Sequence, residues 1–324
     1  MAWSMKIVLI TPSGPTAHTG NRVAASRWAG ILRQLGHRVR VANDYDGGAA
    51  DLMVAVHAWR SADAIERFKA AFPTRPVILQ LSGTDIYEYL NSDPGPTLRS
   101  MEQADRLVAL NDLAWKAVPK SLRARLCVIH QSAPPLALPH RPSRRAVVVS
   151  VIGHLRDVKD PLRAAEAARL LPAMSRIRIE QVGRAYTMEW AERARAEMAI
   201  NPRYQWRGDV PPAAVRRLLA RSHAMVISSL SEGGANVVSE AIMAGVPVLA
   251  SRVDGNVGLL GADYAGYFPV GDTNALARLL QRLERDPSLV TTMRKALARL
   301  KPLFRPAREK AALRRLLADL RRSV

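Results

Sequence analysis

Residues 224–250 read AMVISSLSEGGANVVSEAIMAGVPVLA, and the order of patterns in this stretch decides the fold. A short apolar run ends in two serines, a Glu-Gly-Gly turn follows, and residues 235–245 have helical spacing. A second apolar run occupies residues 247–250. A strand, a glycine turn, a helix and a strand in this order predict one repeat of a parallel α/β sheet.

The same alternation extends in both directions from this stretch. Further strands are predicted at residues 6–11, 38–41, 52–57, 77–81, 107–110, 127–129, 146–152, 178–182, 204–207 and 267–270. Further helices are predicted at residues 21–35, 62–71, 161–171, 187–200 and 211–220, and the pattern is helical almost throughout from residue 272. Short apolar strands that alternate with amphipathic helices predict parallel sheets covered on both faces.

Residues 132–145, SAPPLALPHRPSRR, interrupt this alternation. The segment has four prolines and no hydrophobic periodicity, which predicts a linker. A chain of 324 residues is long enough for about two domains. We therefore expect an α/β protein with two Rossmann-like parallel-sheet domains, residues 1–138 and 139–300, that face each other across a cleft. Ligands of open α/β sheets bind beyond the carboxyl ends of the strands, so the cleft is the expected substrate site.

The charge is strongly positive, because 48 Lys and Arg residues face 28 Asp and Glu residues, a net charge of +20. Such a balance suits nucleic acid, anionic lipid or small anionic substrates. Aromatic residues make up only 5% of the chain, which leaves little to stack on bases. We therefore expect phosphorylated small molecules as substrates and no nucleic-acid partner.

Several common site motifs are absent from the sequence. No strand is followed by G-x-G-x-x-G, and neither the G-x-x-x-x-G-K-[ST] loop nor the G-x-S-x-G elbow occurs. The single cysteine, Cys127, excludes an internal disulfide and a cysteine metal cluster. Asp44-Tyr45-Asp46 precedes two glycines and is interpreted as a polar turn. We expect no metal and no cofactor, and, without an apolar run of about 20 residues, a cytoplasmic protein.

The Glu-Gly-Gly turn is the best candidate for a site. Gly233 and Gly234 allow a ligand to approach the backbone closely, and the N–H groups at the start of the next helix favour a phosphate. These N–H groups belong to Ala235, Asn236 and Val237. Glu240 can accept hydrogen bonds from ribose hydroxyls, and Glu232 can reach the sugar beyond the phosphates. The turn therefore predicts a binding site for a nucleotide sugar.

Glu232 and Glu240, which are separated by seven residues, resemble the E-x7-E signature of glycosyltransferase family 4, retaining enzymes with the GT-B fold. Residues 241–250 match the helix and strand that follow this signature. The family has an arginine and a lysine after the first strand of its second half, where they neutralise the donor diphosphate. Lys159 falls on the lysine, whereas His154 occupies the arginine position and Arg156 lies two residues later. Gly183 resembles a glycine that lines the donor pocket.

Nearly the whole chain resembles a narrower family, the selenosugar synthases of selenoneine biosynthesis (SenB), and most of the similarity lies in the first half. It is carried by Gly20-Asn21-Arg22-Val23, Arg27-Trp28, Leu35-Gly36-His37-Arg38-Val39, Val54-Ala55-Val56-His57-Ala58, Arg60-Ser61, Leu81-Ser82-Gly83-Thr84-Asp85-Ile86-Tyr87, Ala104-Asp105-Arg106-Leu107-Val108, Ile129-His130-Gln131-Ser132-Ala133, Gly153-His154-Leu155-Arg156 and Lys159-Asp160-Pro161. The resemblance implies transfer of N-acetylglucosamine from UDP-N-acetylglucosamine to selenophosphate, with release of UDP and phosphate. It also implies functional coupling to a selenophosphate synthetase and a C-terminal helix, residues 301–324, that crosses back to the first domain.

The acceptor is then a small anion, which the loop 13–22 and the following strand ends are expected to bind. The predicted acceptor contacts are Gly20, Asn21, Arg22, His57, Arg60, Thr84 and Asp85. The predicted catalytic residues are Glu232, Lys159 and His57. Plainer interpretations stay open: Asn21 can cap a helix, His57 can be a satisfied buried histidine, Asp85 can make a turn, and both arginines can be solvated.

Two other functions stay open. One is a family 4 glycosyltransferase that acts on a hydroxyl or thiol, with a basic C-terminal helix that touches membranes. We expect that helix to be structural instead, and a membrane partner is not expected. The other is a basic nucleic-acid-binding module, which would show salt-dependent binding and indifference to UDP.

Overall fold

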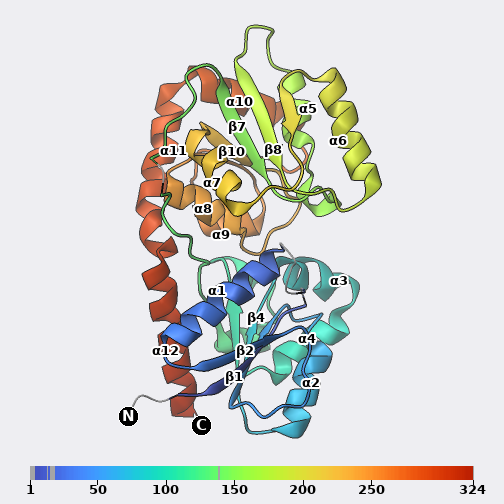
Figure 1. Ribbon diagram of the computed structural model, residues 1–324, viewed down its shortest axis with the longest axis vertical. Coiled ribbons are helices and arrows are strands. Elements are labelled where there is room, and N and C mark those ends of the chain that lie inside the picture. Colours follow the sequence, from blue (N-terminus) through green and yellow to red (C-terminus); the bar gives the residue numbers. More distant parts are fainter. Residues whose placement is uncertain (1–3, 13, 15–18, 138, 324) are drawn as a thin grey trace. The chain divides into compact units, whose positions relative to one another are not determined.

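The computed structural model describes residues 4–12, 14, 19–137 and 139–323 (Figure 1). The chain forms two compact units. The first comprises Met1–Gln131, Gly233–Ala235 and Pro306–Val324, and the second comprises Ser132–Glu232 and Asn236–Arg305. Part of the loop 13–22, namely residues 13 and 15–18, and residue 138 at the expected domain boundary lie outside the described residues.

The first unit contains a six-stranded parallel sheet in the order β2-β1-β3-β4-β5-β6. Its strands are β1 (Lys6–Ile10), β2 (Arg38–Ala42), β3 (Leu52–Val56), β4 (Val77–Gln80), β5 (Arg106–Ala109) and β6 (Leu126–Val128). One face packs on α1 (Gly20–Gln34) and α12 (Pro306–Ser323), and the other on α2 (Ala62–Ala71) and α4 (Pro94–Gln103). Both faces are covered, which explains why the strands are apolar runs without alternation.

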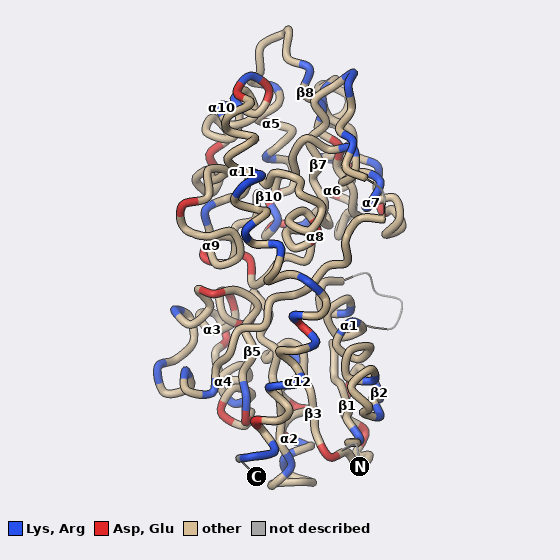
Figure 2. Tube along the Cα trace, turned by 90° about the vertical axis from the view of Figure 1, so that its left-hand side faces the viewer, with Lys and Arg blue, Asp and Glu red and all other residues tan. Residues whose placement is uncertain are grey.

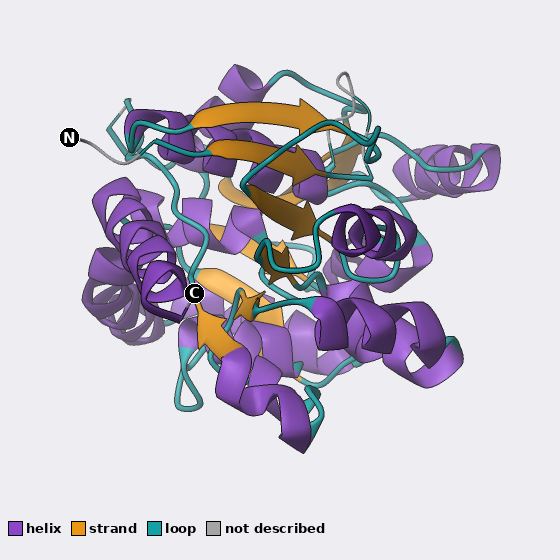
Figure 3. Ribbon diagram, turned by 90° about the horizontal axis from the view of Figure 1, so that it is seen from below, coloured by secondary structure: helices purple, strands orange, loops and turns teal. Residues whose placement is uncertain are grey.

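The second unit contains a six-stranded parallel sheet in the order β12-β11-β10-β7-β8-β9. Its strands are β7 (Val147–Ile152), β8 (Ile177–Val182), β9 (Tyr204–Trp206), β10 (Ala224–Ile227), β11 (Val248–Ser251) and β12 (Tyr267–Phe268). Its helices are α5 (Arg163–Arg169), α6 (Met188–Ile200), α7 (Pro212–Arg221), α8 (Asn236–Ala244), α9 (Asp254–Leu260), α10 (Thr273–Arg285) and α11 (Pro287–Leu300). Helices flank the strands of both sheets (Figure 3), which confirms the predicted α/β class.

The last helix, α12, belongs to the first unit, which confirms the predicted return of the C-terminal helix. It buries a leucine stripe at Leu313, Leu316, Leu317 and Leu320, the spacing of one helical face. These side chains pack in one cluster with Trp28 of α1. Each buried leucine contributes about 1.5–3 kcal/mol of hydrophobic stabilisation, so this face alone anchors the helix.

Lys and Arg residues are spread over many helices and loops of both units (Figure 2). Within the described residues, no helix combines the length and the apolar composition that a bilayer span requires. In the same residues, no three His, Cys, Asp or Glu side chains are grouped as metal ligands would be.

Candidate active site

In the second unit, two strand-end loops are tied to each other. The loop after β10 carries Ser228, whose hydroxyl donates to the carbonyl oxygens of Lys159 and Asp160 at 3.1 and 2.8 Å. The N–H of Leu230 donates to the carbonyl oxygen of Val158 at 2.9 Å. Because both loops follow neighbouring parallel strands, these bonds fix the Lys159 loop against the segment that leads to Glu232.

Lys159 and Glu232, both predicted as catalytic, form an ion pair. The Lys159 ammonium donates to Glu232 Oε1, and the Ser229 hydroxyl donates to the same oxygen at 2.5 Å. The Glu232 side chain is 7% exposed, whereas that of Lys159 is 25% exposed. A carboxylate buried to this degree needs a charged partner, and the partner here still reaches solvent. The pair is therefore one that a charged ligand can rearrange.

Two residues that the sequence analysis did not single out hold the backbone at Glu232 and three residues before it. A Cβ at Gly255, in α9, would lie 1.7 Å from the carbonyl oxygen of Glu232, so α9 packs directly on this peptide. The Ser251 hydroxyl donates to the carbonyl oxygen of Ser229 at 2.6 Å. Glu232 is thus fixed from its backbone as well as from its carboxylate.

The glycines of the Glu-Gly-Gly turn belong to the first unit and are crowded there by the protein's own chain. A Cβ at Gly233 would lie 2.3 Å from the backbone nitrogen of Gly83. A Cβ at Gly234 would lie 2.4 Å from the Cβ of Leu110. The sequence analysis explained both glycines by the close approach of a ligand. In the structure the close approach of Gly83 and Leu110 is by itself enough to require glycine at both positions.

The remaining predicted donor contacts lie after this turn. Ala235 is buried, and Asn236 and Val237 are the first two residues of α8, half-buried. Glu240 is the fifth residue of that helix and is also half-buried. The helix therefore begins one residue later than predicted.

Gly183 lies at the end of β8 with a φ of 135°. A Cβ there would lie 2.1 Å from the carbonyl oxygen of Gly153, so this glycine lets the ends of β7 and β8 approach. Arg156 stands at the start of the Lys159 turn, with its guanidinium 5.6 Å from the centre of the Tyr186 ring. The guanidinium of Arg184 lies 5.2 Å from the centre of the same ring, so two cations contact one aromatic side chain.

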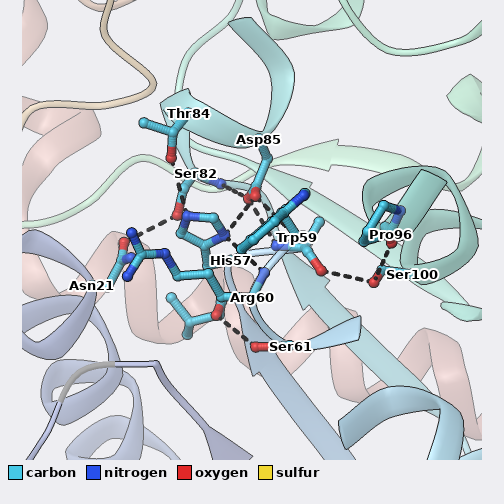
Figure 4. A network of polar contacts seen from close by, with 12 residues as sticks. Asn21, His57, Trp59, Arg60, Ser61, Ser82, Thr84, Asp85, Pro96 and Ser100 are labelled. Atoms are coloured by element: carbon cyan, nitrogen blue, oxygen red, sulfur yellow. Dashed lines mark hydrogen bonds and ion pairs between the residues drawn. The ribbon is translucent and has the colours of Figure 1, made fainter. Parts of the chain in front are cut away.

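In the first unit, Asp85 is the centre of a polar network that connects the ends of β3 and β4 (Figure 4). Its carboxylate lies 2.7 Å from Nδ1 of His57. It also accepts three backbone N–H groups, from Ala58 and Ser82 at 2.8 Å and from Trp59 at 3.0 Å. The Asp85 side chain is fully buried, so these bonds replace its water. This arrangement favours a positioning role over direct contact with an acceptor.

The partners of His57 assign its tautomer. A carboxylate only accepts, so Nδ1 carries the proton toward Asp85, and the Thr84 hydroxyl, 3.1 Å from Nε2, is then the donor. The N–H of Arg60 also points at Nδ1, but at 3.3 Å it competes poorly with the 2.7 Å contact. His57 therefore has an oriented ring whose Nε2 faces the hydroxyl of Thr84.

The backbone of His57 is in the left-handed region, with a φ of 77°. Its N–H donates to the carbonyl oxygen of Gln80 at 3.0 Å, and its carbonyl oxygen accepts from Ser61 at 3.1 Å. A left-handed conformation at a residue other than glycine is unfavourable by about 1–3 kcal/mol, and such strain concentrates at functional sites. Its local structure thus favours a functional role over the plain buried histidine.

The helix α1 supplies the other predicted acceptor contacts. Thr19 caps this helix, its hydroxyl accepting from the N–H of Arg22 at 3.3 Å, so the alternative that Asn21 is the cap is wrong. Asn21 instead accepts from the Ser82 hydroxyl at 3.0 Å, which joins α1 to the loop after β4. Gly20 is the first helical residue, Arg22 is half-buried, and Arg60 is exposed.

Within each unit the structure therefore brings some predicted residues together. Lys159 and Glu232 are in contact in the second unit, and His57, Thr84 and Asp85 are in contact in the first. The sequence analysis gave no role to Ser82, Ser229 and Ser251. The only sequence feature that could have indicated them is that serines or small polar residues follow several strands.

Residues 140–299 match the family model of glycosyl transferases group 1. The matched region contains Lys159, Glu232 and Glu240, and it supports a glycosyltransferase.

Solved structures share the fold across nearly the whole chain. HepE (Alr3699) of Anabaena, in complex with UDP, is 17% identical with a TM-score of 0.78, covering 97% of this chain and 100% of that chain. Sucrose-phosphate synthase of Thermosynechococcus elongatus is also 17% identical with a TM-score of 0.78, covering 98% and 99%. A glycosyltransferase of Rickettsia africae is 13% identical with a TM-score of 0.73, covering 98% of both chains. The GT-B fold is therefore confirmed.

Proposed function

We propose that this protein is a glycosyltransferase that moves N-acetylglucosamine from UDP-N-acetylglucosamine to selenophosphate. The observation that carries the glycosyltransferase part is the Lys159–Glu232 pair at two strand ends inside the family match. The selenium part is supported by the sequence resemblance of the first half and by its strained, oriented His57.

The donor would be held by residues of the pair and the turn. Lys159 exchanges Glu232 for the donor diphosphate, and stabilisation of this leaving group is the main catalytic contribution. Glu232, released from the Lys159 ammonium, accepts hydrogen bonds from hydroxyls of the sugar, while Glu240 accepts hydrogen bonds from hydroxyls of the ribose. HepE is solved with UDP and with UDP-glucose, which supports uridine as the nucleoside of the donor.

The transfer proceeds in two balanced steps. Selenium of selenophosphate forms a bond to the anomeric carbon, and the bond from this carbon to the diphosphate oxygen breaks, which releases UDP. Water then cleaves the selenium–phosphorus bond and gives phosphate and the 1-seleno sugar. Selenophosphate is already an anionic nucleophile, so His57 is assigned to orientation of the anion together with Asn21, Arg22 and Arg60.

The test is release of UDP from UDP-N-acetylglucosamine, with and without selenophosphate generated in place, followed by mass detection of the sugar. Release that depends on selenophosphate, with the selenium isotope pattern on the sugar, is the expected result. Donor binding without this product would leave a glycosyltransferase with a hydroxyl or thiol acceptor. Salt-dependent binding of nucleic acid with indifference to UDP would overturn both.

The acceptor assignment has its own test. Replacing the half-buried Arg22, in Arg22→Ala, removes a charge from the acceptor side and should raise the KM for selenophosphate about tenfold. The Kd for UDP should change less than about twofold. Equal loss for donor and acceptor would defeat the assignment of Arg22 to the acceptor.

A further inference from the structure

The Glu-Gly-Gly turn is held by two buried side-chain amides that neither the motif nor the family match includes. Asn111, after β5, donates from Nδ2 to the carbonyl oxygen of Gly233 at 2.7 Å. Gln131, after β6, donates from Nε2 to the carbonyl oxygen of Gly234 at 2.6 Å. Asn111 is fully buried and Gln131 is 3% exposed. Two consecutive carbonyl groups of the turn thus each accept a hydrogen bond from a side-chain amide of the first unit.

The orientation of both amides is determined by their other partners. The oxygen of Asn111 accepts from the N–H of Leu113 at 2.9 Å. The oxygen of Gln131 accepts from the Arg27 guanidinium at 2.5 Å, and a guanidinium can only donate. In each case the amide nitrogen is therefore the end that faces the turn.

Arg27 is in turn fixed by the last helix. Its Nε lies 3.0 Å from a carboxylate oxygen of Glu309, and the other oxygen accepts from the indole N–H of Trp28 at 2.9 Å. The Glu309 side chain has no exposed surface. A buried carboxylate with these partners holds one rotamer of Arg27, which in turn holds Gln131.

The peptide geometry then decides where the N–H groups of the turn point. In a trans peptide the N–H points opposite to the C=O of the same plane, and the described chain has no cis peptide. Because the carbonyl of Gly233 points at Asn111, the N–H of Gly234 points away from it. The N–H of Ala235 likewise points away from Gln131. Within the described residues, neither N–H donates to a protein acceptor.

We infer that Asn111 and Gln131 are positioning residues that aim the N–H groups of Gly234 and Ala235 at the donor diphosphate. The inference rests on the proposed function, because it needs a nucleotide-sugar donor at this turn. Gly83 and Leu110 crowd the glycines, so the turn has little room for another set of peptide planes. Without the two amides the peptides would rotate, and the diphosphate would lose aligned donors.

The variants keep the approximate size of each side chain and remove the donating NH2 group; the two acidic variants also add a negative charge. Gln131→Glu and Asn111→Asp place a carboxylate oxygen against the carbonyl oxygens of the turn. Gln131→Met removes the donor without adding charge, and serves if the acidic variants do not fold. Gln34→Glu is the matched control, because Gln34 is an exposed amide of α1 that accepts from Lys310 on α12.

The readout is the affinity of the full chain for UDP and for uridine, by calorimetry and ligand-observed NMR, together with KM and kcat. We expect the donor-deleting variants to weaken UDP about tenfold or more and uridine less than about twofold, with an unchanged melting temperature in Gln34→Glu. Equal losses of affinity for UDP and uridine, or no loss for either, would overturn the positioning role. UDP binding by the wild type would still support the proposed donor in that case. A wild type that does not bind UDP would overturn both.

Discussion

Asp85 and Glu232, the carboxylates of the two contact pairs in the candidate site, have opposite surroundings. Asp85 in the first unit has its oxygens occupied by three backbone N–H groups and the His57 ring, and no part of its side chain is exposed. Glu232 in the second unit contacts a lysine and a serine through one oxygen, and its lysine is one-quarter exposed. A carboxylate whose partners are mostly backbone holds a fold together, whereas one held by side chains, one of which reaches solvent, is available to a ligand.

The same change in both carboxylates should separate these roles, with the larger effect on stability at Asp85. In Asp85→Asn an NH2 group faces backbone donors, and we expect a loss of about 3 kcal/mol in unfolding free energy. Urea unfolding followed by tryptophan fluorescence measures it. A loss of unfolding free energy below about 1 kcal/mol would mean that the Asp85 network contributes little to the stability of the fold.

Glu232→Gln should reduce kcat/KM about hundredfold and change the unfolding free energy by only about 1 kcal/mol. The amide oxygen still accepts from Ser229, and Lys159 reaches water when it loses its partner. Steady-state UDP release measures the first effect and urea unfolding the second. If Glu232→Gln lost as much stability as Asp85→Asn, the contrast between the two pairs would be wrong.

Gly255→Ala tests whether the backbone of Glu232 matters as much as its side chain. The new methyl group would overlap the Glu232 carbonyl, so we expect about 1–3 kcal/mol of destabilisation together with a lower kcat. Gly30→Ala is the control, because this glycine is inside α1 and a Cβ there meets nothing within 4 Å. Thermal melting should show Gly30→Ala more stable by about 0.5–1 kcal/mol.

The smallest expected effect is a background pH dependence that belongs to neither pair. Burial, then the charges of His140 and Arg294, lower the pKa of His223 below its usual 6.5, and burial also lowers the pKa of His37. The unfolded chain then binds more protons, so stability is complete above pH 6.5 and falls as the pH drops below it. Melting temperatures at pH 7.5 and 5.5 measure this fall, and His223→Gln should reduce it.

The sequence predicted the elements well because their signals are local. Helix 62–71 is observed at the predicted bounds, and the strand ends differ by one or two residues. Lys159 and Glu232 could be singled out from motifs, but their contact depends on Ser228 and Ser229 after β10, which have no distinctive spacing. The left-handed His57 could not be predicted, since its conformation is imposed by Gln80 and Ser61 through the fold.

Asn111 and Gln131 show why the rest was missed. Each meets the turn from more than one hundred residues away in the chain, and an isolated amide after a strand resembles any polar cap. Gly233 and Gly234 were singled out for the approach of a ligand, whereas in the structure the protein's own chain packs against them. A sequence alone cannot distinguish a close protein neighbour from a close ligand.

The burial of Glu309 has a consequence for synthesis. The first unit is assembled from three separate stretches of the chain, and its α1 face needs the carboxylate of Glu309 for Arg27 and for the Trp28 indole. Residues 4–131 leave the ribosome long before this helix, so the nascent first unit exposes an apolar face, and Arg27 lacks its carboxylate partner, until residues 306–323 have been synthesised. A chain cut short before residue 306 would keep that face exposed and become a substrate for chaperones and proteases.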